Sequence, residues 1–273
     1  MSYKTLLVHA GADEAGERRL RLTKALADRF EARVIGAGAS AWAPFVDVGV
    51  GYAAEAYTVV LENVKSDIAD ARAAFDKVFA GYPHGAEWRA EIVYPDRWLI
   101  DLARGADLIV ASHRKGGEDS RRFAEPTPVI MESGAPVLLC PPGLESLSFG
   151  TVLVAWKDTR ESRRAIAEAL PLLKLAGRVL LVGICRETAQ AGVEAQMRQV
   201  LERLARHGIK AEAEAPPAVK PSTAEDLLAV AASRGADLMV LGAYGHSRMR
   251  EWVFGGVTTD LLAGAPLSLL FGR

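Results

Sequence analysis

The sequence predicts two tandem α/β domains, each built on an open five-stranded parallel sheet flanked by helices. Three observations lead to this fold class. The chain has 273 residues and is half apolar, which is enough for two domains of ordinary size. Short apolar runs alternate with longer amphipathic segments, the pattern of parallel strands joined by crossover helices. The run RGADL occurs at 104–108 and again at 234–238, so the chain contains one unit twice.

Each unit supplies five predicted strands. Every one is a short run rich in β-branched residues or leucine, bounded by polar or glycine-containing segments. In the first unit they cover residues 4–9, 32–38, 86–94, 107–112 and 137–140. In the second unit they cover residues 151–156, 178–185, 209–215, 237–242 and 266–271.

Helix signals are clearest in the second unit. Asp158 stands three residues before Glu161, and Ser222 stands three before Glu225, which is the spacing of a capping box. Gly208 is predicted to end a helix with one apolar face. That face carries Val193, Met197, Val200, Leu201 and Leu204.

The segment 141–150 is rich in proline, glycine and serine and predicts a short linker. We therefore expect an N-terminal domain over 1–143 and a C-terminal domain over 149–273. Thr5 aligns with Thr151, a shift of 146, whereas the later markers shift by 130, so the first unit carries about 16 extra residues. They fall near 40–56. The apolar part of this stretch, Trp42 to Tyr52, is compatible with a lid, a domain contact or a dimer contact.

Composition and charge argue against several classes of function. Lys and Arg number 17 against 21 Asp and Glu in residues 1–146, and 16 against 13 in the remainder. Without a basic stripe, no nucleic-acid partner is indicated. Cys140 and Cys185 lack a CxxC or histidine partner pattern, so neither a disulfide framework nor a metal site is expected. The chain enters a strand directly and has no membrane-spanning apolar stretch, which predicts a cytoplasmic protein with no membrane contact.

Glycines distinguish the second unit from the first. Gly242 ends a predicted strand, Gly245 follows, and Gly255-Gly256 precedes a helical pattern. Glycines let a backbone approach an anion and turn N–H groups toward it, and a helix N-terminus adds its positive dipole end. Spacing alone is equally compatible with a turn and a connector. The equivalent positions in the first unit are Ser112, Lys115, Glu125 and Pro126.

Location favours a ligand site. In open parallel sheets, ligands bind beyond the carboxyl ends of the strands, where the strand order reverses. If the first and fourth strands of the second unit are neighbours, Trp156-Lys157-Asp158 and Gly242-Ala243-Tyr244-Gly245 converge on one crevice of nucleotide size. Asp158 is also a candidate helix cap, and Trp156 is also a candidate core residue.

The stretch GAYGHSRMREWVFGGVT, residues 242–258, resembles the ATP-binding signature of universal stress proteins, Gly-x2-Gly-x9-Gly followed by Ser or Thr. The runs VLVAWKDTRESRRAI and GAPLSLL resemble the same UspA-like family, and the duplication resembles its tandem two-domain type. The resemblance implies strand order 3-2-1-4-5 in each domain and packing of the two domains as an internal pseudo-dimer, with a homodimer left open. It also implies ATP, with or without Mg²⁺, as the ligand.

The resemblance implies which residues of this sequence bind ATP. The phosphates are expected at Gly242, Gly245, His246, Ser247, Gly255, Gly256, Val257 and Thr258. The adenine and ribose are expected at Ala155, Trp156, Lys157, Asp158 and Ile184. Two positions depart from the family pattern. Gly256 stands where the family has Ser or Thr, with Thr258 as the nearest hydroxyl, and Lys157 stands where it has an acidic residue, with Asp158 next to it. Because the first unit lacks all three glycines, ATP is not expected there by this mode.

Together these features predict a cytoplasmic stress-response regulator that binds ATP in its C-terminal domain, with any hydrolysis slow and incidental. No residue makes a convincing catalytic base. One alternative is an enzyme, a slow ATPase or an AMP-forming transferase, with Asp158 placing a metal and His246 or Arg248 stabilising charge. The other is a ligand-free scaffold, in which the glycines only turn the chain and the segment Trp42 to Tyr52 contacts a partner.

Overall fold

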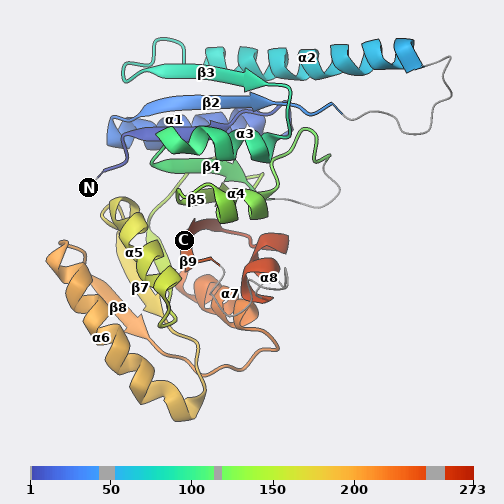
Figure 1. Cartoon of the computed structure of the whole chain (residues 1–273). Coiled ribbons are helices and arrows are strands. Elements are labelled where there is room, and N and C mark those ends of the chain that lie inside the picture. The colour runs from blue at the N-terminus through green and yellow to red at the C-terminus, as the bar shows by residue number, and fades with distance from the viewer. Residues whose placement is uncertain (1, 43–52, 114–118, 244–255) are drawn as a thin grey trace. The chain divides into compact units, whose positions relative to one another are not determined.

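The computed structural model describes residues 2–42, 53–113, 119–243 and 256–273. Most of the apolar segment Trp42 to Tyr52 lies outside them. The chain divides into two compact units, coloured blue to green and yellow to red in Figure 1. The N-terminal unit contains Tyr3–Ser133 and Pro142–Glu145, and the C-terminal unit contains Ser146–Arg273 and also Gly134–Pro141. The domain limits expected from the repeat, 1–143 and 149–273, stay a prediction.

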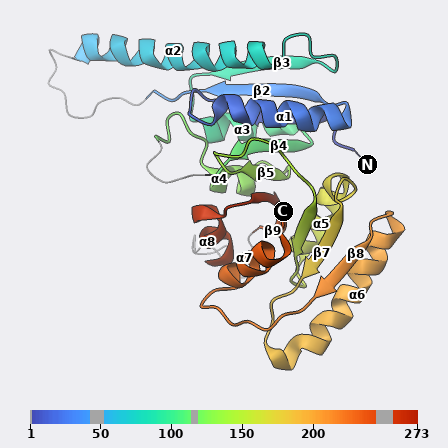
Figure 2. The ribbon, with the colours of Figure 1, turned by 180° about the vertical axis from the view of Figure 1, so that it is seen from behind.

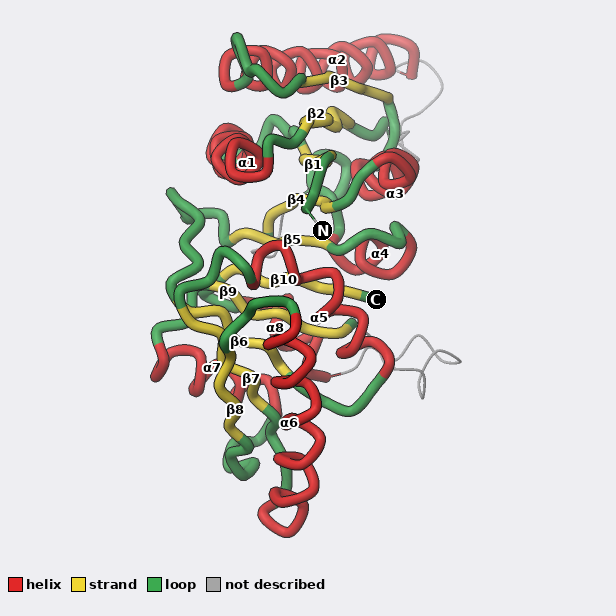
Figure 3. Tube along the Cα trace, turned by 90° about the vertical axis from the view of Figure 1, so that its left-hand side faces the viewer, coloured by secondary structure: helices red, strands yellow, loops and turns green. Residues whose placement is uncertain are grey.

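The N-terminal unit has a parallel sheet in the order β3-β2-β1-β4. Its strands are β1 (Thr5–His9), β2 (Arg33–Ala39), β3 (Ala86–Glu91) and β4 (Leu108–Ser112). Its helices are α1 (Gly16–Phe30), α2 (Ala53–Val78), α3 (Pro95–Leu102), the 3₁₀ turn η1 (Ala103–Gly105) and α4 (Pro126–Glu132). Viewed along the sheet, α1 lies on one side of the strands, and α3 and α4 lie on the other (Figure 3).

The C-terminal unit has five parallel strands in the order β8-β7-β6-β9-β10, which is the predicted order 3-2-1-4-5. They are β6 (Thr151–Ala155), β7 (Arg178–Val182), β8 (Ala211–Glu214), β9 (Leu238–Gly242) and β10 (Ser268–Gly272). The strand β5 (Val137–Cys140) pairs with β10 in antiparallel direction. The helices are α5 (Arg160–Leu173), the 3₁₀ turn η2 (Glu187–Ala189), α6 (Gln190–Arg206), α7 (Thr223–Arg234) and α8 (Gly256–Gly264). Figure 2 shows α6 running beside β8.

The predicted α/β fold class is confirmed, and each predicted strand is present. The central strands form because their side chains are apolar on both faces, as a parallel sheet covered by helices requires. In β1, for example, Leu6, Leu7 and Val8 are fully buried. The outer strands β3 and β8 instead carry the charged sequences AEWRAE and AEAE, which protect an exposed sheet edge from further pairing.

The predicted caps of the C-terminal helices are confirmed at one helix and wrong at another. Ser222 caps α7, because its side chain accepts a hydrogen bond from the Glu225 N–H at 3.2 Å. The residue that caps α5 is Thr159 rather than Asp158, since the Thr159 hydroxyl accepts from the Ser162 N–H at 3.3 Å. Gly208 follows α6 with a left-handed φ of 77°, a conformation that glycine adopts without strain.

Candidate functional site

The expected crevice depends on the first and fourth strands of the second unit being neighbours, and they are. β6 pairs with β9 in parallel, with Val152 opposite Leu238 and Val154 opposite Val240. The strand order reverses between them, since β6 leads to β7 on one side while β9 lies on the other. The carboxyl ends of β6 and β9 therefore meet at the edge where parallel sheets bind ligands.

The described residues of the predicted site fall at three strand ends and one helix start. Ala155 ends β6 and is followed by Trp156, Lys157 and Asp158, and Ile184 lies two residues beyond β7. Gly242 ends β9, while Gly256, Val257 and Thr258 begin α8. The pairing of β6 with β7 and β9 brings the three strand ends together. The other predicted phosphate residues, Gly245, His246, Ser247 and Gly255, lie outside the described residues.

The end of β9 lies directly against the first turn of α5. A Cβ atom added to Gly242 would lie 2.5 Å from both the carbonyl carbon of Glu161 and the backbone nitrogen of Ser162. Gly272, opposite Gly242 in β10, would place a Cβ 2.5 Å from Ala165 Cα. These glycines bring the N-terminal turn of α5, with its positive dipole end, to the strand ends. Gly256 has open space around it.

Trp156 continues β6 by one residue, since its backbone N–H donates to the Val182 carbonyl at 2.7 Å. The residue is only 8% exposed. The indole Nε1 is buried, and within the described ranges no hydrogen-bond acceptor faces it. The site thus contains a buried polar donor at the strand end where the base and ribose are expected.

The charges beside the strand ends pair locally. Asp158, which is exposed, pairs through Oδ1 with Arg163 Nη2 at 3.4 Å, and the buried Glu161 pairs through Oε1 with Arg160 Nη2 at 3.3 Å. In the part of the chain that the structure describes, no group of His, Cys, Asp and Glu side chains is arranged to hold a metal ion. Neither Cys140 nor Cys185 is in a disulfide.

The corresponding edge of the N-terminal unit contains a buried polar cluster that sequence reasoning missed. Arg19 is 1% exposed. Its Nε donates to the His9 carbonyl at 2.6 Å, Nη1 to Ser112 Oγ at 2.7 Å, and Nη2 to Asp13 Oδ2 at 2.5 Å. One signal could have revealed it, because Arg19 occupies the stripe of α1 that otherwise carries Leu20, Leu26 and similar residues.

The cluster shifts the pKa values of its members. Burial, together with the nearby Arg19 charge, lowers the pKa of His9 to about 3. Burial alone raises the pKa of Asp13, but the charge and hydrogen bonds of Arg19 outweigh it, so this pKa lies below its usual value. At neutral pH the cluster therefore holds a neutral histidine beside an ion pair.

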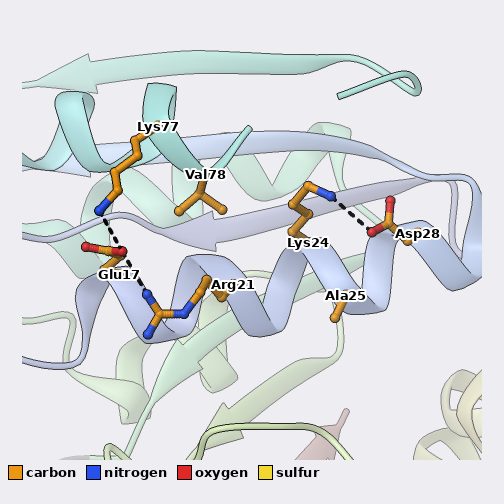
Figure 4. A pocket seen from close by; sticks show the side chains of 7 residues that line it. All are labelled: Glu17, Arg21, Lys24, Ala25, Asp28, Lys77 and Val78. Carbon is orange, nitrogen blue, oxygen red and sulfur yellow. Dashed lines mark hydrogen bonds and ion pairs between the residues drawn. The ribbon is translucent and has the colours of Figure 1, made fainter. Parts of the chain in front are cut away.

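A shallow surface pocket of about 390 Å³ lies between α1 and α2 in the N-terminal unit (Figure 4). No residue of the predicted site lines it. Glu17 accepts from Arg21 at 2.7 Å and from Lys77 at 3.1 Å, and Lys24 pairs with Asp28 at 3.2 Å. These charged side chains already pair with one another, so the pocket is not well suited to bind a charged ligand.

A family model described as the universal stress protein family matches residues 148–272. No curated protein matches the sequence. Among the described helices, none has both the length and the apolar character to cross a membrane.

Solved structures match nearly the whole chain. The structure of a universal stress protein from Archaeoglobus fulgidus DSM 4304 aligns with a TM-score of 0.69 and 14% identity over 98% of each chain. A proposed universal stress protein from Pseudomonas aeruginosa UCBPP-PA14 aligns with a TM-score of 0.64, and a functionally unknown protein from Pseudomonas aeruginosa PAO1 with 0.61. Both are 12% identical, over 98% of this chain and 92% of theirs.

At these identities the structural matches establish the fold along the chain, while the family model matches the sequence of its second half. The family model thus assigns residues 148–272 to the universal stress protein family, and the fold along the whole chain is similar to that of a solved universal stress protein.

Proposed function

We propose that the protein is a cytoplasmic stress-response regulator that binds ATP at the carboxyl ends of β6 and β9 in its C-terminal unit. The observation that carries the proposal is the adjacency of these two strands, with the first turn of α5 packed on Gly242. A helix N-terminus at a strand-order reversal is a favourable place for a phosphate chain. The segment that follows Gly242 belongs to the part of the chain that the family model matches.

In this proposal the two groups of predicted residues bind different parts of ATP. The phosphates bind along the glycine-containing segment from Gly242 to Thr258, and the base and ribose bind beside Trp156 and Ile184. Thr258 lies in the first turn of α8, where its hydroxyl replaces the one that Gly256 lacks. Asp158 contacts the ribose after releasing Arg163, which costs little because both side chains are about half exposed.

The regulatory part of the proposal is that ATP binding changes conformation or partner choice. ATP, with or without Mg²⁺, is then a signal, and hydrolysis is slow or absent. The tandem units are proposed to pack as an internal pseudo-dimer. The N-terminal unit supports the other without binding ATP, because Arg19 and Asp13 already use the polar groups at its strand ends.

Calorimetric titration of the full chain with ATP, with and without Mg²⁺, tests the proposal on protein stripped of copurified nucleotide. We expect one ATP per chain. Gly245→Asp should abolish binding, because a carboxylate in the phosphate segment repels the ligand. The matched control is Gly105→Asp, at an exposed glycine with open space in the other unit, which should bind normally.

Three results are informative against the proposal. Absence of binding at millimolar ATP would overturn it and favour the ligand-free scaffold. Two ATP molecules per chain would contradict the passive role of the N-terminal unit. Rapid release of inorganic phosphate from bound ATP would favour the ATPase alternative instead.

A further inference from the structure

We propose that the segment 119–124 is an internal plug, which closes the strand-end crevice of the N-terminal unit to ligands and opens locally when its ion pair with Asp67 is released. This crevice is the counterpart, in the first copy of the repeat, of the site proposed in the C-terminal unit. The inference goes beyond the proposed function and does not depend on ATP binding. It is carried by the place of the segment, by its attachment to α2, and by its internal hydrogen bonds.

The first step is the place of the plug. β1 and β2 are the first two strands of the first copy, as β6 and β7 are of the second, and both pairs are parallel. The plug contacts the ends of β1 and β2. The Ala41 N–H, two residues beyond β2, donates to the Arg121 carbonyl at 2.8 Å, and the Phe123 ring meets the ring of His9, at the end of β1, edge-on with centroids 6.3 Å apart. The plug thus crosses the edge where open parallel sheets bind ligands.

The side chains of the plug fill this edge. Phe123 is 5% exposed and Ala124 is 1% exposed, and His9 beneath them is 1% exposed. A buried phenylalanine covers a large apolar area, and protein interiors are packed too closely to admit a second group into the same volume. While these residues are in place, the crevice is therefore closed to a ligand.

The second step is the attachment of the plug to α2. Arg122 Nε lies 2.8 Å from Asp67 Oδ2. The same carboxylate oxygen accepts from Ser40 Oγ at 3.2 Å, so Asp67 connects the end of β2 with the plug. The Arg122 side chain is 48% exposed, whereas that of Asp67 is 15% exposed. Water and salt compete for a pair with a half-exposed arginine, so the ion pair holds the plug closed by only a modest factor.

The third step is the hydrogen bonding within the plug. The Asp119 carbonyl accepts from the N–H groups of Arg122 and Phe123, each at 2.9 Å, and the Asp119 carboxylate accepts from Arg121 Nε at 2.9 Å. A turn that satisfies its own polar groups keeps these bonds when it moves away from the protein. Opening therefore breaks the Ala41 hydrogen bond, the ion pair and the packing of Phe123, and leaves the turn intact.

The second copy of the repeat does not carry the plug sequence. With the shift of 130, the positions of Asp119 and Arg122 are held by Met249 and Trp252, so neither the aspartate of the turn nor the arginine of the ion pair is repeated. The structure of those positions lies outside the described residues. The plug sequence thus belongs to the first copy, which lacks the glycines of the proposed site.

Hydrogen exchange of the Ala41 amide in the full chain measures opening directly, because this N–H donates to the plug. Asp67→Asn keeps the shape of the side chain but removes its charge, so Ala41 exchange should become about two- to fivefold faster. The matched control is Asp76→Asn, which removes a carboxylate of the same helix that pairs with Arg72 and should leave Ala41 exchange unchanged. Equal Ala41 exchange in Asp67→Asn and the wild type would overturn the inference.

The urea dependence of the same exchange separates a plug from a part of the core. Local opening exposes far less surface than unfolding, so Ala41 exchange should change little at low urea concentrations. The reference is the amide of Val34, which is fully buried at the other end of β2 and donates to the Gly85 carbonyl at 2.9 Å. Its exchange should accelerate with urea. The same urea dependence at both amides would mean that the segment opens only when the unit unfolds, which would overturn the inference.

Closure to ligands is tested with ATP as the probe. Millimolar ATP should leave the Ala41 exchange of the wild type unchanged, because the plug keeps the nucleotide out of this crevice. Ala41 exchange that ATP slows or accelerates would overturn the inference. Protein that binds no ATP would overturn the proposed function alone, since the Asp67 and urea experiments need no ligand.

Discussion

Arg19 is the residue on which the strand-end cluster of the N-terminal unit depends. Replacing it by methionine keeps most of the side-chain volume but leaves the Asp13 carboxylate, which is 19% exposed, without its partner. Breaking a buried ion pair in this way typically costs about 3–5 kcal/mol. We therefore expect Arg19→Met to lower the free energy of unfolding of the full chain by about that amount in urea titrations.

The matched control is Arg21→Met on the same helix. Arg21 is half exposed and pairs with Glu17, so its replacement should change stability by less than about 1 kcal/mol. The double variant Arg19→Met with Asp13→Asn should be less destabilised than the sum of the single variants, because no charge is left alone. Equal and additive losses would show that Arg19 acts through packing alone.

His9 makes the stability of the N-terminal unit depend on pH. Its pKa of about 3 in the folded state lies below its usual value of 6.5, so the native state holds a neutral ring that the unfolded state protonates first. The stabilising contribution is complete above pH 6.5 and is lost as pH falls toward 3. Between pH 7 and pH 4.5 this loss amounts to roughly 2–3 kcal/mol.

A His9→Leu variant separates this contribution from general acid destabilisation. The variant has no ring to protonate, so its free energy of unfolding should fall less than that of the wild type over the same pH interval. Asp13 also destabilises both proteins on acidification. Its pKa is lowered in the folded state, so its stabilising contribution is lost when the pH falls below the usual pKa range of an aspartate. Parallel pH profiles of wild type and His9→Leu would refute the assignment to His9.

The sequence did not predict this cluster, and the reason is physical. An arginine on a helix is usually solvated, and its charge says nothing about which carbonyl or carboxylate the fold brings near it. Only the apolar neighbours of Arg19 on α1 marked the position as buried. The position of Trp156 at a strand end was predicted, but the lack of an acceptor for its buried N–H among the described residues was not, because it depends on every surrounding element.

Among the elements, α5 shows the limit of local sequence signals. Asp158 and Thr159 are adjacent residues that both serve as helix caps, and the spacing to Glu161 favoured the aspartate. The backbone decides between them. Thr159 has the extended conformation of a cap, with φ −130° and ψ 161°, and its hydroxyl reaches the Ser162 N–H. A one-residue error at a helix start therefore changes which side chain remains available to a ligand.

The contact between α5 and β9 predicts opposite effects at two glycines of the proposed site. A methyl group at Gly242 would meet backbone atoms of Glu161 and Ser162 at 2.5 Å, so Gly242→Ala should lower the free energy of unfolding by about 1–3 kcal/mol. Gly256 begins α8 with open space around it, so Gly256→Ala should be neutral or stabilise by up to about 1 kcal/mol.

Thermal unfolding of both variants, with and without ATP, checks these expectations. If the backbone at Gly256 approaches a phosphate, Gly256→Ala should reduce the ATP-induced rise in Tm while leaving the unliganded protein intact. Gly242→Ala should lower Tm in both conditions. Unchanged stability of Gly242→Ala would mean that α5 does not pack against the end of β9 as described.

At the scale of the whole molecule, the sequence predicted where the strands lie but did not predict that β5 pairs with β10. Buried apolar runs mark strands such as β6 and β9 locally, and the repeat fixed their count in each unit. The predicted strand over 178–185 extends past the end of β7 at Val182 because its apolar run continues into the strand-end loop. The partner of β5 is a contact far along the sequence, which periodicity does not encode, and β5 pairs with β10 of the C-terminal unit.

This pairing makes a prediction about where the C-terminal unit can be cut. Leu139 lies opposite Leu269, Leu138 opposite Leu270, and Val137 opposite Phe271, so β5 covers an otherwise open edge of β10. Apolar cross-strand pairs contribute about 0.2–1 kcal/mol each, and an exposed apolar edge strand invites pairing with another molecule. A fragment of residues 134–273 should therefore be monomeric and melt at a higher temperature than a fragment of residues 146–273.

Light scattering after size-exclusion chromatography and thermal unfolding of the two fragments decide the matter. We expect the shorter fragment to self-associate through the β10 edge. Two monomeric fragments with the same Tm would show that β5 adds nothing to the C-terminal unit, and would place the domain limit near 149, where the repeat predicts it. A lower Tm and self-association of the shorter fragment would instead make β5 part of the unit that binds the proposed ligand, although it comes from the first copy of the repeat.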